Sequence, residues 1–226
     1  MINLKKPIDK PAAYNVFIDL DKTILSQNSG TILVKKAHSA GIMRTRDLLM
    51  GLYMSILYKM EWRDTRKIIN AMAMWMKGHS EEEFSKFAAS IVQDYLIDLI
   101  RPEMKEHISN HRSEGGRIVM LSAALSYICD PIGEYLGMDQ IISSHLEVKD
   151  GLFTGKPIGR LCFGVEKLKS LRMYCTEHPC ELSNDYYYAD SISDLHVLKV
   201  VGHPVCVDPD KRLANYAKRH NWQVIP

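Results

Sequence analysis

Short runs of apolar residues recur along the chain and alternate with longer stretches of helical periodicity. The runs at 15–18 (Asn-Val-Phe-Ile) and 117–121 (Arg-Ile-Val-Met-Leu) are nearly continuous in apolar character. Such runs are typical of parallel strands that helices cover on both faces. We therefore predict an α/β fold with a buried parallel sheet. The expected strands are Tyr14–Asp19, Arg117–Ser122, Asp185–Asp190 and Pro204–Asp208.

About a hundred residues without a convincing strand separate the first two expected strands, far more than one crossover helix requires. An inserted helical unit is the natural interpretation. Its last helix begins with the capping box Ser80-Glu-Glu-Glu83. We place the unit at residues 26–105 and the sheet domain at 1–25 plus 106–226. The helices expected in the unit are Thr31–Ala40, Thr45–Tyr58, Trp62–Met76 and Glu81–Leu99.

The connections after the helical unit are short. Asp150-Gly151 predicts a tight hairpin turn within Glu147–Thr154. Near the end of the chain, Asp208 and Pro209 have the character of the cap and first residue of a helix reaching about His220. The other expected helices are Pro102–Glu114, Ser126–Leu136 and Gly164–Tyr174.

The composition, 46% hydrophobic and 25% charged, is that of an ordinary globular protein. The 29 basic and 27 acidic residues are mixed along the chain, so a nucleic-acid partner is not indicated. The N-terminus is too polar for a secretory signal, and no window of about 18 apolar residues occurs. We expect a soluble, cytoplasmic protein, and nothing in the sequence indicates its oligomeric state.

The cysteine pattern favours reduced thiols. There are five cysteines, an odd number, with no C-x-x-C pair, which fits a cytosolic protein better than a disulfide framework. Cys175, His178 and Cys180 lie close together but lack a fourth ligand and the usual spacing of a zinc site. We interpret that segment as a loop.

Two aspartates follow the first expected strand in the sequence Asp19-Leu-Asp21-Lys-Thr23. This is the carboxyl end of a strand, where open parallel sheets bind their ligands. Aspartates two apart in an extended chain point to the same side, and close carboxylates raise a pKa or recruit a cation. Mg²⁺ is the expected cation, since it prefers oxygen ligands and offsets the charge of a phosphate. The alternative is a pair of capping aspartates on a surface turn.

Three further strand and helix ends carry polar residues. Ser122, followed by Ala123, ends the second strand and could donate its hydroxyl to a phosphoryl oxygen; alternatively it caps a helix. Lys167 occupies the first turn of a helix, where it opposes the helix dipole unless an anion binds nearby; alternatively it is an ordinary surface lysine. Asp190 ends the third expected strand and Asp194 follows at a helix start, so both could reach one cation.

With these residues in place, the chain resembles the haloacid dehalogenase superfamily, in particular the subfamily IB branch that contains phosphoserine phosphatases. The resemblance runs from about Tyr14 to the C-terminus. Segments 148–155 and 201–209 are also similar to that branch. It implies a Rossmann-like catalytic core at 1–25 and 106–226 with an all-helical C1-type cap at 26–105. Its motifs, in order, are D-x-D-x-T at Asp19–Thr23, Ser122, Lys167, and D-S-x-x-D at Asp190–Asp194.

The resemblance implies Mg²⁺-dependent hydrolysis of a small phosphomonoester. Asp19 is expected to attack phosphorus and form an aspartyl-phosphate, while Asp21 protonates the leaving alcohol and then activates water. The metal ligands implied are Asp19, the backbone carbonyl of Asp21, and Asp190, with Asp194 in support. This assigns both chemistry and metal binding to the edge of one sheet.

The resemblance also assigns the phosphate-binding residues. Ser122 with Ala123 and Lys167 are expected to hold the phosphoryl oxygens, Lys167 neutralising charge in the transition state, and Thr23 to orient the loop. Phosphoserine phosphatases usually carry an acidic residue shortly after the first motif to receive the substrate ammonium. This chain has Asn28 and Ser29 there, so Asn28 is a candidate substrate-binding residue and an amino-acid substrate is not favoured.

Seven of the twelve methionines fall between Met43 and Met76, among many leucines and aromatic residues. Such density could form an adaptable apolar pocket or contact a membrane surface. The substrate would then have an apolar portion, as a lysophospholipid has. The alternative is the core of a small helical bundle.

Two other functions stay open at this point. A phosphotransferase would pass the phosphoryl group to an alcohol other than water. A non-catalytic binding module would keep the fold and hold a ligand under the cap, although Asp19, Asp21, Lys167 and Asp190 are all present.

Overall fold

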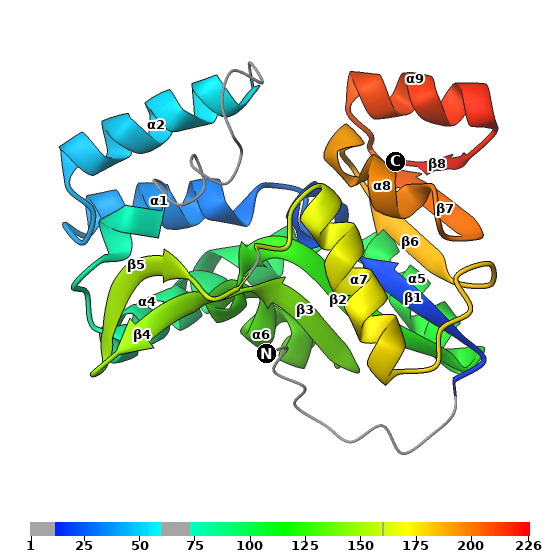
Figure 1. Cartoon of the computed structure of the whole chain (residues 1–226), viewed down its shortest axis with the longest axis horizontal. Coiled ribbons are helices and arrows are strands. Elements are labelled where there is room, and N and C mark those ends of the chain that lie inside the picture. Colours follow the sequence, from blue (N-terminus) through cyan, green and yellow to red (C-terminus); the bar gives the residue numbers. More distant parts are fainter. Residues whose placement is uncertain (1–11, 60–72, 160) are drawn as a thin grey trace.

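The computed structural model describes residues 12–59, 73–159 and 161–226, and in this part of the chain six strands form one sheet (Figure 1). The strand order is β3-β2-β1-β6-β7-β8, and every neighbouring pair is parallel. The predicted α/β class with a parallel sheet is confirmed. The strands are β1 Tyr14–Ile18, β2 Gly116–Leu125, β3 Gln140–Ser144, β6 Tyr186–Ala189, β7 His203–Val207 and β8 Gln223–Ile225.

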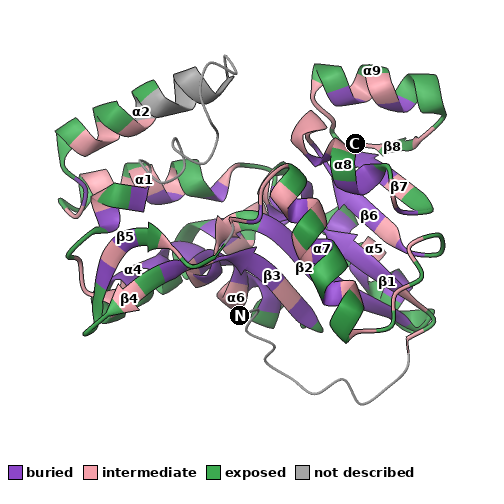
Figure 2. Cartoon of the chain, viewed as in Figure 1, coloured by how far each residue is buried: buried purple, intermediate pink, exposed green. Residues whose placement is uncertain are grey.

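Helices cover both faces of the sheet, which explains why its strands are apolar on both sides. Val16 and Ile18 of β1 pack with α5 (Pro102–Ser113) and α6 (Ser126–Tyr135) on one face. Phe17 packs on the other face with three helices. The central strands are accordingly buried over most of their length, and only the last three residues of β2 leave the core (Figure 2). The helices on the second face are α7 Val165–Glu177, α8 Leu195–Leu198 and α9 Lys211–His220.

A helical insertion separates β1 from β2, as predicted. Ser80 caps α4 by accepting a hydrogen bond from the backbone N–H of Glu83 at 3.4 Å, which confirms the N-terminal signal. Most of the helix predicted at Trp62–Met76 lies outside the described residues, and its end forms the 3-10 turn η2. The helical elements are α1 Ser29–Ser39, α2 Thr45–Lys59, η2 Met74–Met76, α4 Glu81–Ile91, η3 Val92–Leu96 and η4 Ile97–Leu99.

The chain leaves and re-enters the sheet region through two adjacent segments. Leu25 and Ile100 form an antiparallel bridge, and the backbone N–H of Arg101 donates to the carbonyl of Ile24 at 2.9 Å. This pairing holds the two ends of the insertion together. The division at residues 26 and 105 stays a prediction.

The predicted hairpin is present as β4 (Leu146–Lys149) and β5 (Leu152–Pro157). Its turn residues Asp150 and Gly151 both have positive φ, 52° and 75°, as a type I′ turn requires. Phe153 of β5 packs edge-on against Phe84 of α4 with ring centroids 5.5 Å apart. The hairpin therefore packs against the helical insertion.

Three features of the fold differ from the predictions. Strands β3 and β8 were missed, and β2 extends three residues beyond the predicted end at Ser122. The cap of the last helix is Asp210, not Asp208: its carboxylate accepts hydrogen bonds from the N–H groups of Arg212 and Leu213 at 2.8 and 2.9 Å. Pro209 precedes the helix because α9 begins only at Lys211.

Among the described helices, none combines the length and the apolar character that crossing a membrane demands.

Candidate active site

Lys167 is the centre of a buried ion-pair network at the carboxyl edge of the sheet. Its Nζ lies 3.0 Å from Oδ1 of Asp19 and 2.7 Å from Oδ2 of Asp194. The same Asp194 oxygen accepts a 2.7 Å hydrogen bond from the hydroxyl of Tyr187. Lys167 and Asp194 are each 2% exposed. The end of β1, the first turn of α7 and the turn after β6 therefore meet at one point.

Asp19 and Asp190 directly follow the neighbouring strands β1 and β6. The backbone N–H of Asp19 donates to the carbonyl of Tyr188 at 3.0 Å, which continues the strand pairing to the sheet edge. The carbonyl of Asp190 accepts a 2.8 Å hydrogen bond from the N–H of Asp210. Because carboxyl ends of parallel strands share one edge, the fold brings these two carboxylates to the same side.

Asp19 and Asp21 both have extended backbone dihedrals, with ψ of 157° and 126°, and the chain turns sharply at Lys22. Residues 20–24 form a π-type turn in which Lys22 has φ 59° and ψ 2°. The Asp21 carboxylate accepts hydrogen bonds from Nδ2 of Asn28 at 2.9 Å and from the N–H of Ser29 at 2.7 Å. The turn places the charge of Asp21 close enough to act on the pKa of Asp19.

The remaining predicted residues surround this network. Ser122 is 1% exposed, and its Oγ accepts the N–H of Ala124 at 3.2 Å, which leaves the hydroxyl proton for donation. Ala123 is exposed, and its carbonyl accepts a hydrogen bond from Ser144 at 2.8 Å. The hydroxyl of Thr23 is buried and has no hydrogen-bond partner within the described part of the chain.

Burial controls the charges of the acidic residues. It raises the pKa of Asp19 to about 7 against the opposing attraction of Lys167, and Asp194 and Asp21 add to the rise. Burial likewise raises the pKa of Asp190 to about 7. For Lys167, burial alone would lower the pKa, but Asp19 and Asp194 more than offset it and hold the pKa above its ordinary value. The lysine therefore stays charged.

The site carries more carboxylates than Lys167 can neutralise. The atoms available as metal ligands are carboxylate oxygens, which Mg²⁺ prefers. In the segments that the structure describes, no three His, Cys, Asp or Glu side chains form a group that could hold an ion by themselves. Mg²⁺ commonly keeps several waters and uses one or two carboxylates. Asp19 and Asp190 with a backbone carbonyl fit that mode better than four aspartate side chains do, because Asp194 already binds Lys167 and Tyr187.

Sequence reasoning missed the parts played by Tyr187 and Ser29. Tyr187 is fully buried below the sheet edge and fixes Asp194, while the N–H of Ser29 binds Asp21. Three consecutive tyrosines at 186–188 gave no signal of which one faces the site. Strand periodicity places only the middle one on the face that carries α7.

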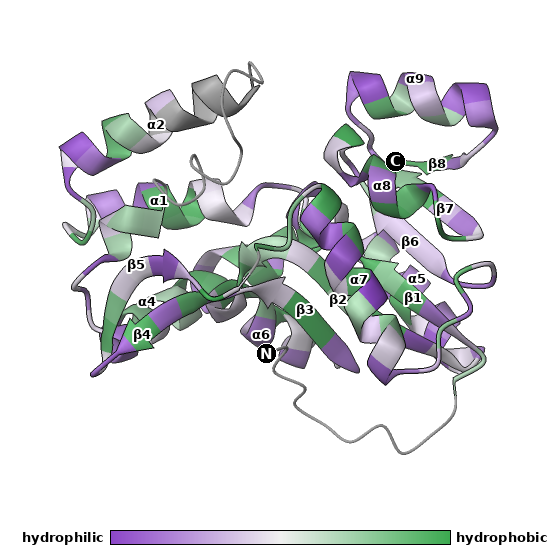
Figure 3. Cartoon of the chain, viewed as in Figure 1, coloured by the Kyte–Doolittle hydropathy of each residue, from purple (hydrophilic) through white to green (hydrophobic). Residues whose placement is uncertain are grey.

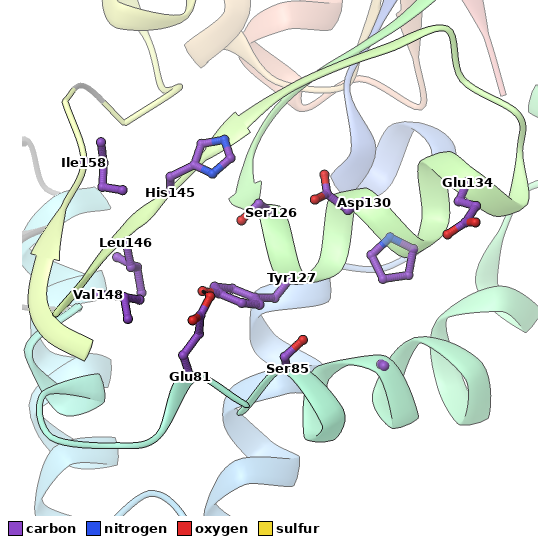
Figure 4. Close-up of a pocket in the computed structure, with 12 residues that line it drawn as sticks. Glu81, Ser85, Ser126, Tyr127, Asp130, Glu134, His145, Leu146, Val148 and Ile158 are labelled. Carbon is purple, nitrogen blue, oxygen red and sulfur yellow. Dashed lines mark hydrogen bonds between the residues drawn. The ribbon is translucent and has the colours of Figure 1, made fainter. Parts of the chain in front are cut away.

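A groove of about 500 Å³ lies between α4, α6 and the β4–β5 hairpin (Figure 4). Its lining includes Glu81, Tyr127, Asp130 and His145, and the Tyr127 hydroxyl donates to Glu81 at 2.8 Å. None of the residues predicted for catalysis or metal binding lines it. We therefore locate the candidate active site at the Lys167 network and not in this groove.

The chain is similar to known hydrolases and phosphatases along most of its length. The sequence model of the haloacid dehalogenase-like hydrolases matches residues 16–199. A probable phosphatase of Mycobacterium tuberculosis is 29% identical over 220 residues, which cover 92% of this chain and 74% of that protein. A phosphoserine phosphatase of the same organism is 24% identical over 222 residues, covering 96% of this chain and 71% of its own length.

A solved structure of a protein of unknown function from Bordetella pertussis has the same fold. It superimposes with a TM-score of 0.87 at 20% identity and covers 96% of this chain and 99% of its own. At that identity the likeness concerns the fold alone.

Proposed function

The chain belongs to the haloacid dehalogenase-like hydrolases, as a phosphomonoester hydrolase of the phosphoserine-phosphatase-like branch, and we propose that Asp19 is its nucleophile. The observation that carries this proposal is the contact of the buried Lys167 with Asp19. A lysine held there can stabilise the charge that develops on the transferring phosphoryl group. Its second contact, with Asp194, fixes its position.

The proposed reaction has two steps. In the first, an Asp19 oxygen attacks phosphorus, the bond to the substrate alcohol breaks, and Asp21 gives its proton to the leaving oxygen. In the second, water attacks the aspartyl-phosphate, Asp21 takes the proton from that water, and inorganic phosphate leaves with Asp19 regenerated. The raised pKa of Asp21, caused first by burial, suits a carboxyl group that must carry a proton. In this proposal Ser122 donates its hydroxyl to a phosphoryl oxygen, which its free hydroxyl proton supports.

We assign Mg²⁺ to Asp19, Asp190 and the backbone carbonyl of Asp21. When bound, it offsets the negative charge of the phosphate that would otherwise repel the attacking carboxylate. Asp194 supports the site through Lys167.

For the substrate, we propose a small phosphomonoester with an apolar portion, of which a lysophospholipid is one example. Support comes from α2, where Leu49, Met50 and Tyr53 are 60%, 51% and 54% exposed. Hydrophobic residues follow the polar start of this helix (Figure 3). Met43 and Met76, by contrast, are buried, so only part of the methionine-rich segment serves as core.

The test is a panel of phosphorylated metabolites and lysophospholipids assayed with Mg²⁺, with added acceptor alcohols in parallel. We expect phosphate release, fastest for esters with an acyl or other apolar group. New phosphoesters in place of free phosphate would identify a phosphotransferase. Tight binding of one ligand without any phosphate release would identify a binding module and contradict the proposed hydrolysis.

A further inference from the structure

Asn28 joins the turn that carries Asp21 to the first helix of the insertion. Its Nδ2 donates to Oδ2 of Asp21 at 2.9 Å. Its Oδ1 accepts the N–H of Thr31 at 2.8 Å and the Thr31 hydroxyl at 3.0 Å. One side chain therefore caps α1 and binds the carboxylate.

The orientation of the Asn28 amide is fixed by its contact with Thr31. The Thr31 backbone N–H can only donate, so it requires the carbonyl oxygen of the amide, and this turns the NH₂ group toward Asp21. This candidate substrate-binding residue therefore already uses both ends of its amide in contacts with the protein.

The second anchor of Asp21 comes from the same helix start. The N–H of Ser29 donates to Oδ1 of Asp21 at 2.7 Å, so each carboxylate oxygen has its own donor. Two donors on two oxygens fix both the position and the rotation of the carboxyl plane. A proton donor must be held in such a way, because proton transfer needs contact at hydrogen-bond distance.

We propose that Asn28 is a positioning residue for proton transfer by Asp21, and not a substrate ligand. This inference depends on the proposed function, in which Asp21 protonates the leaving alcohol. It predicts that damage at Asn28 acts on leaving groups that need a proton. An alkyl phosphate releases a basic alkoxide and needs one, whereas 4-nitrophenyl phosphate releases a stable anion and does not.

Asn28→Asp is the sharpest variant. Aspartate caps a helix as well as asparagine does, so the bond to Thr31 is kept. Its second oxygen replaces the Nδ2 donor and faces the Asp21 carboxylate, which repels it. Asn28→Ala, which removes both contacts, serves as the second variant. Ser80→Ala is the matched control, since it removes the cap of α4 without touching Asp21.

The measurement is kcat/KM for 4-nitrophenyl phosphate and for the alkyl phosphate of the panel that the wild-type protein hydrolyses fastest. We expect both Asn28 variants to lose about 100-fold on the alkyl ester and to stay within roughly threefold on the nitrophenyl ester. Ser80→Ala should change neither value, although its Tm falls as that of Asn28→Ala does.

Equal losses of kcat/KM on the two esters would overturn the inference, because a lost substrate contact affects both esters alike whereas a lost proton donor does not. If the wild-type protein is active and both Asn28 variants keep its kcat/KM on the alkyl ester, the inference about Asn28 fails while the proposed function stands. A wild-type protein that hydrolyses no ester of the panel overturns the proposed function, and the inference with it.

Discussion

At the scale of single residues, the candidate site is a set of buried charges that hold one another in place. Lys167 is buried between the carboxylates of Asp19 and Asp194, and the hydroxyl of Tyr187 donates a further hydrogen bond to Asp194. Removing one partner of a buried pair costs more than its contact energy, because the other charge is left unpaired. The network therefore links stability and chemistry through the same atoms.

Substitution of Lys167 by Met should reduce kcat by about 100-fold or more, because a donor to the transition-state charge is lost. The free energy of unfolding should fall by about 3 kcal/mol, since Asp194 loses its buried partner. Steady-state kinetics and urea titration measure the two effects. A variant with kcat near that of wild type would remove Lys167 from the mechanism.

Tyr187→Phe is a milder change in the same network than Lys167→Met. The ring stays buried, but the hydrogen bond to Asp194 is lost, at a cost of about 1 kcal/mol in unfolding free energy. We expect kcat to fall less than tenfold, since Lys167 keeps both ion pairs. A loss as large as that of Lys167→Met would mean that Tyr187 itself contacts the substrate.

The sequence was enough to select candidate residues for this site, but not to predict which residues hydrogen-bond to them. Asp19 and Asp190 could be placed because each ends a recognisable strand. The contact of Asn28 with Asp21 could not, since it depends on the turn at 20–24 and the positive φ of Lys22. Local backbone geometry of that kind leaves no periodic signal.

At the scale of elements, strand β3 shows the limit of hydrophobic pattern. Three of its five residues are polar (Gln140, Ser143 and Ser144), so its sequence does not read as a buried strand. Ser144 is buried because its hydroxyl donates to the Ala123 carbonyl at 2.8 Å and accepts from the N–H of Cys162 at 3.1 Å. Polar side chains of β3 can therefore be buried, because they form hydrogen bonds with segments that are distant in the sequence.

The start of α9 offers a matched pair of variants. Asp210→Ala removes the cap and a 2.7 Å hydrogen bond from the N–H of Ile192, so unfolding free energy should fall by about 2 kcal/mol. Asp208→Asn removes the charge from an ion pair with Arg101 in which the Asp208 side chain is 70% exposed, which is worth less than about 1 kcal/mol, and asparagine tolerates the positive φ of 38° at this position. Thermal or urea unfolding of the two proteins compares them. Equal losses would contradict the assignment of Asp210 as the cap.

At the scale of the whole molecule, the fold collects negative charge at one sheet edge. Nearly continuous apolar strands and the long strand-free insertion were enough to predict this architecture. They did not predict that the β4–β5 hairpin packs on the insertion, because Phe153 and Phe84 are 69 residues apart, the difference of their numbers, and no local pattern pairs them.

The raised pKa values of Asp19 and Asp190, both about 7, make stability depend on pH when metal is removed. In the unfolded chain these groups titrate near a pKa of about 3.9. Between about pH 4 and pH 7 the native state therefore holds more protons than the unfolded state, and stability falls as pH rises.

Mg²⁺ binds the deprotonated carboxylates, so the increase in Tm that it produces should be larger at pH 8 than at pH 5. Thermal unfolding in EDTA and in excess Mg²⁺ at both pH values measures this, with Asp190→Asn as the control that should respond less. An equal increase in Tm at the two pH values, or the same response in the variant, would count against a site at these carboxylates.

The central claim is that Asp19 carries the phosphoryl group. Its most direct test is acid quenching of the enzyme during turnover of its best substrate with Mg²⁺, followed by mass spectrometry of the peptide that contains Asp19. We predict a phosphoryl group on that peptide in the wild-type protein, and neither the modification nor turnover in Asp19→Asn. Phosphate release by Asp19→Asn at a rate near that of wild type would contradict the account.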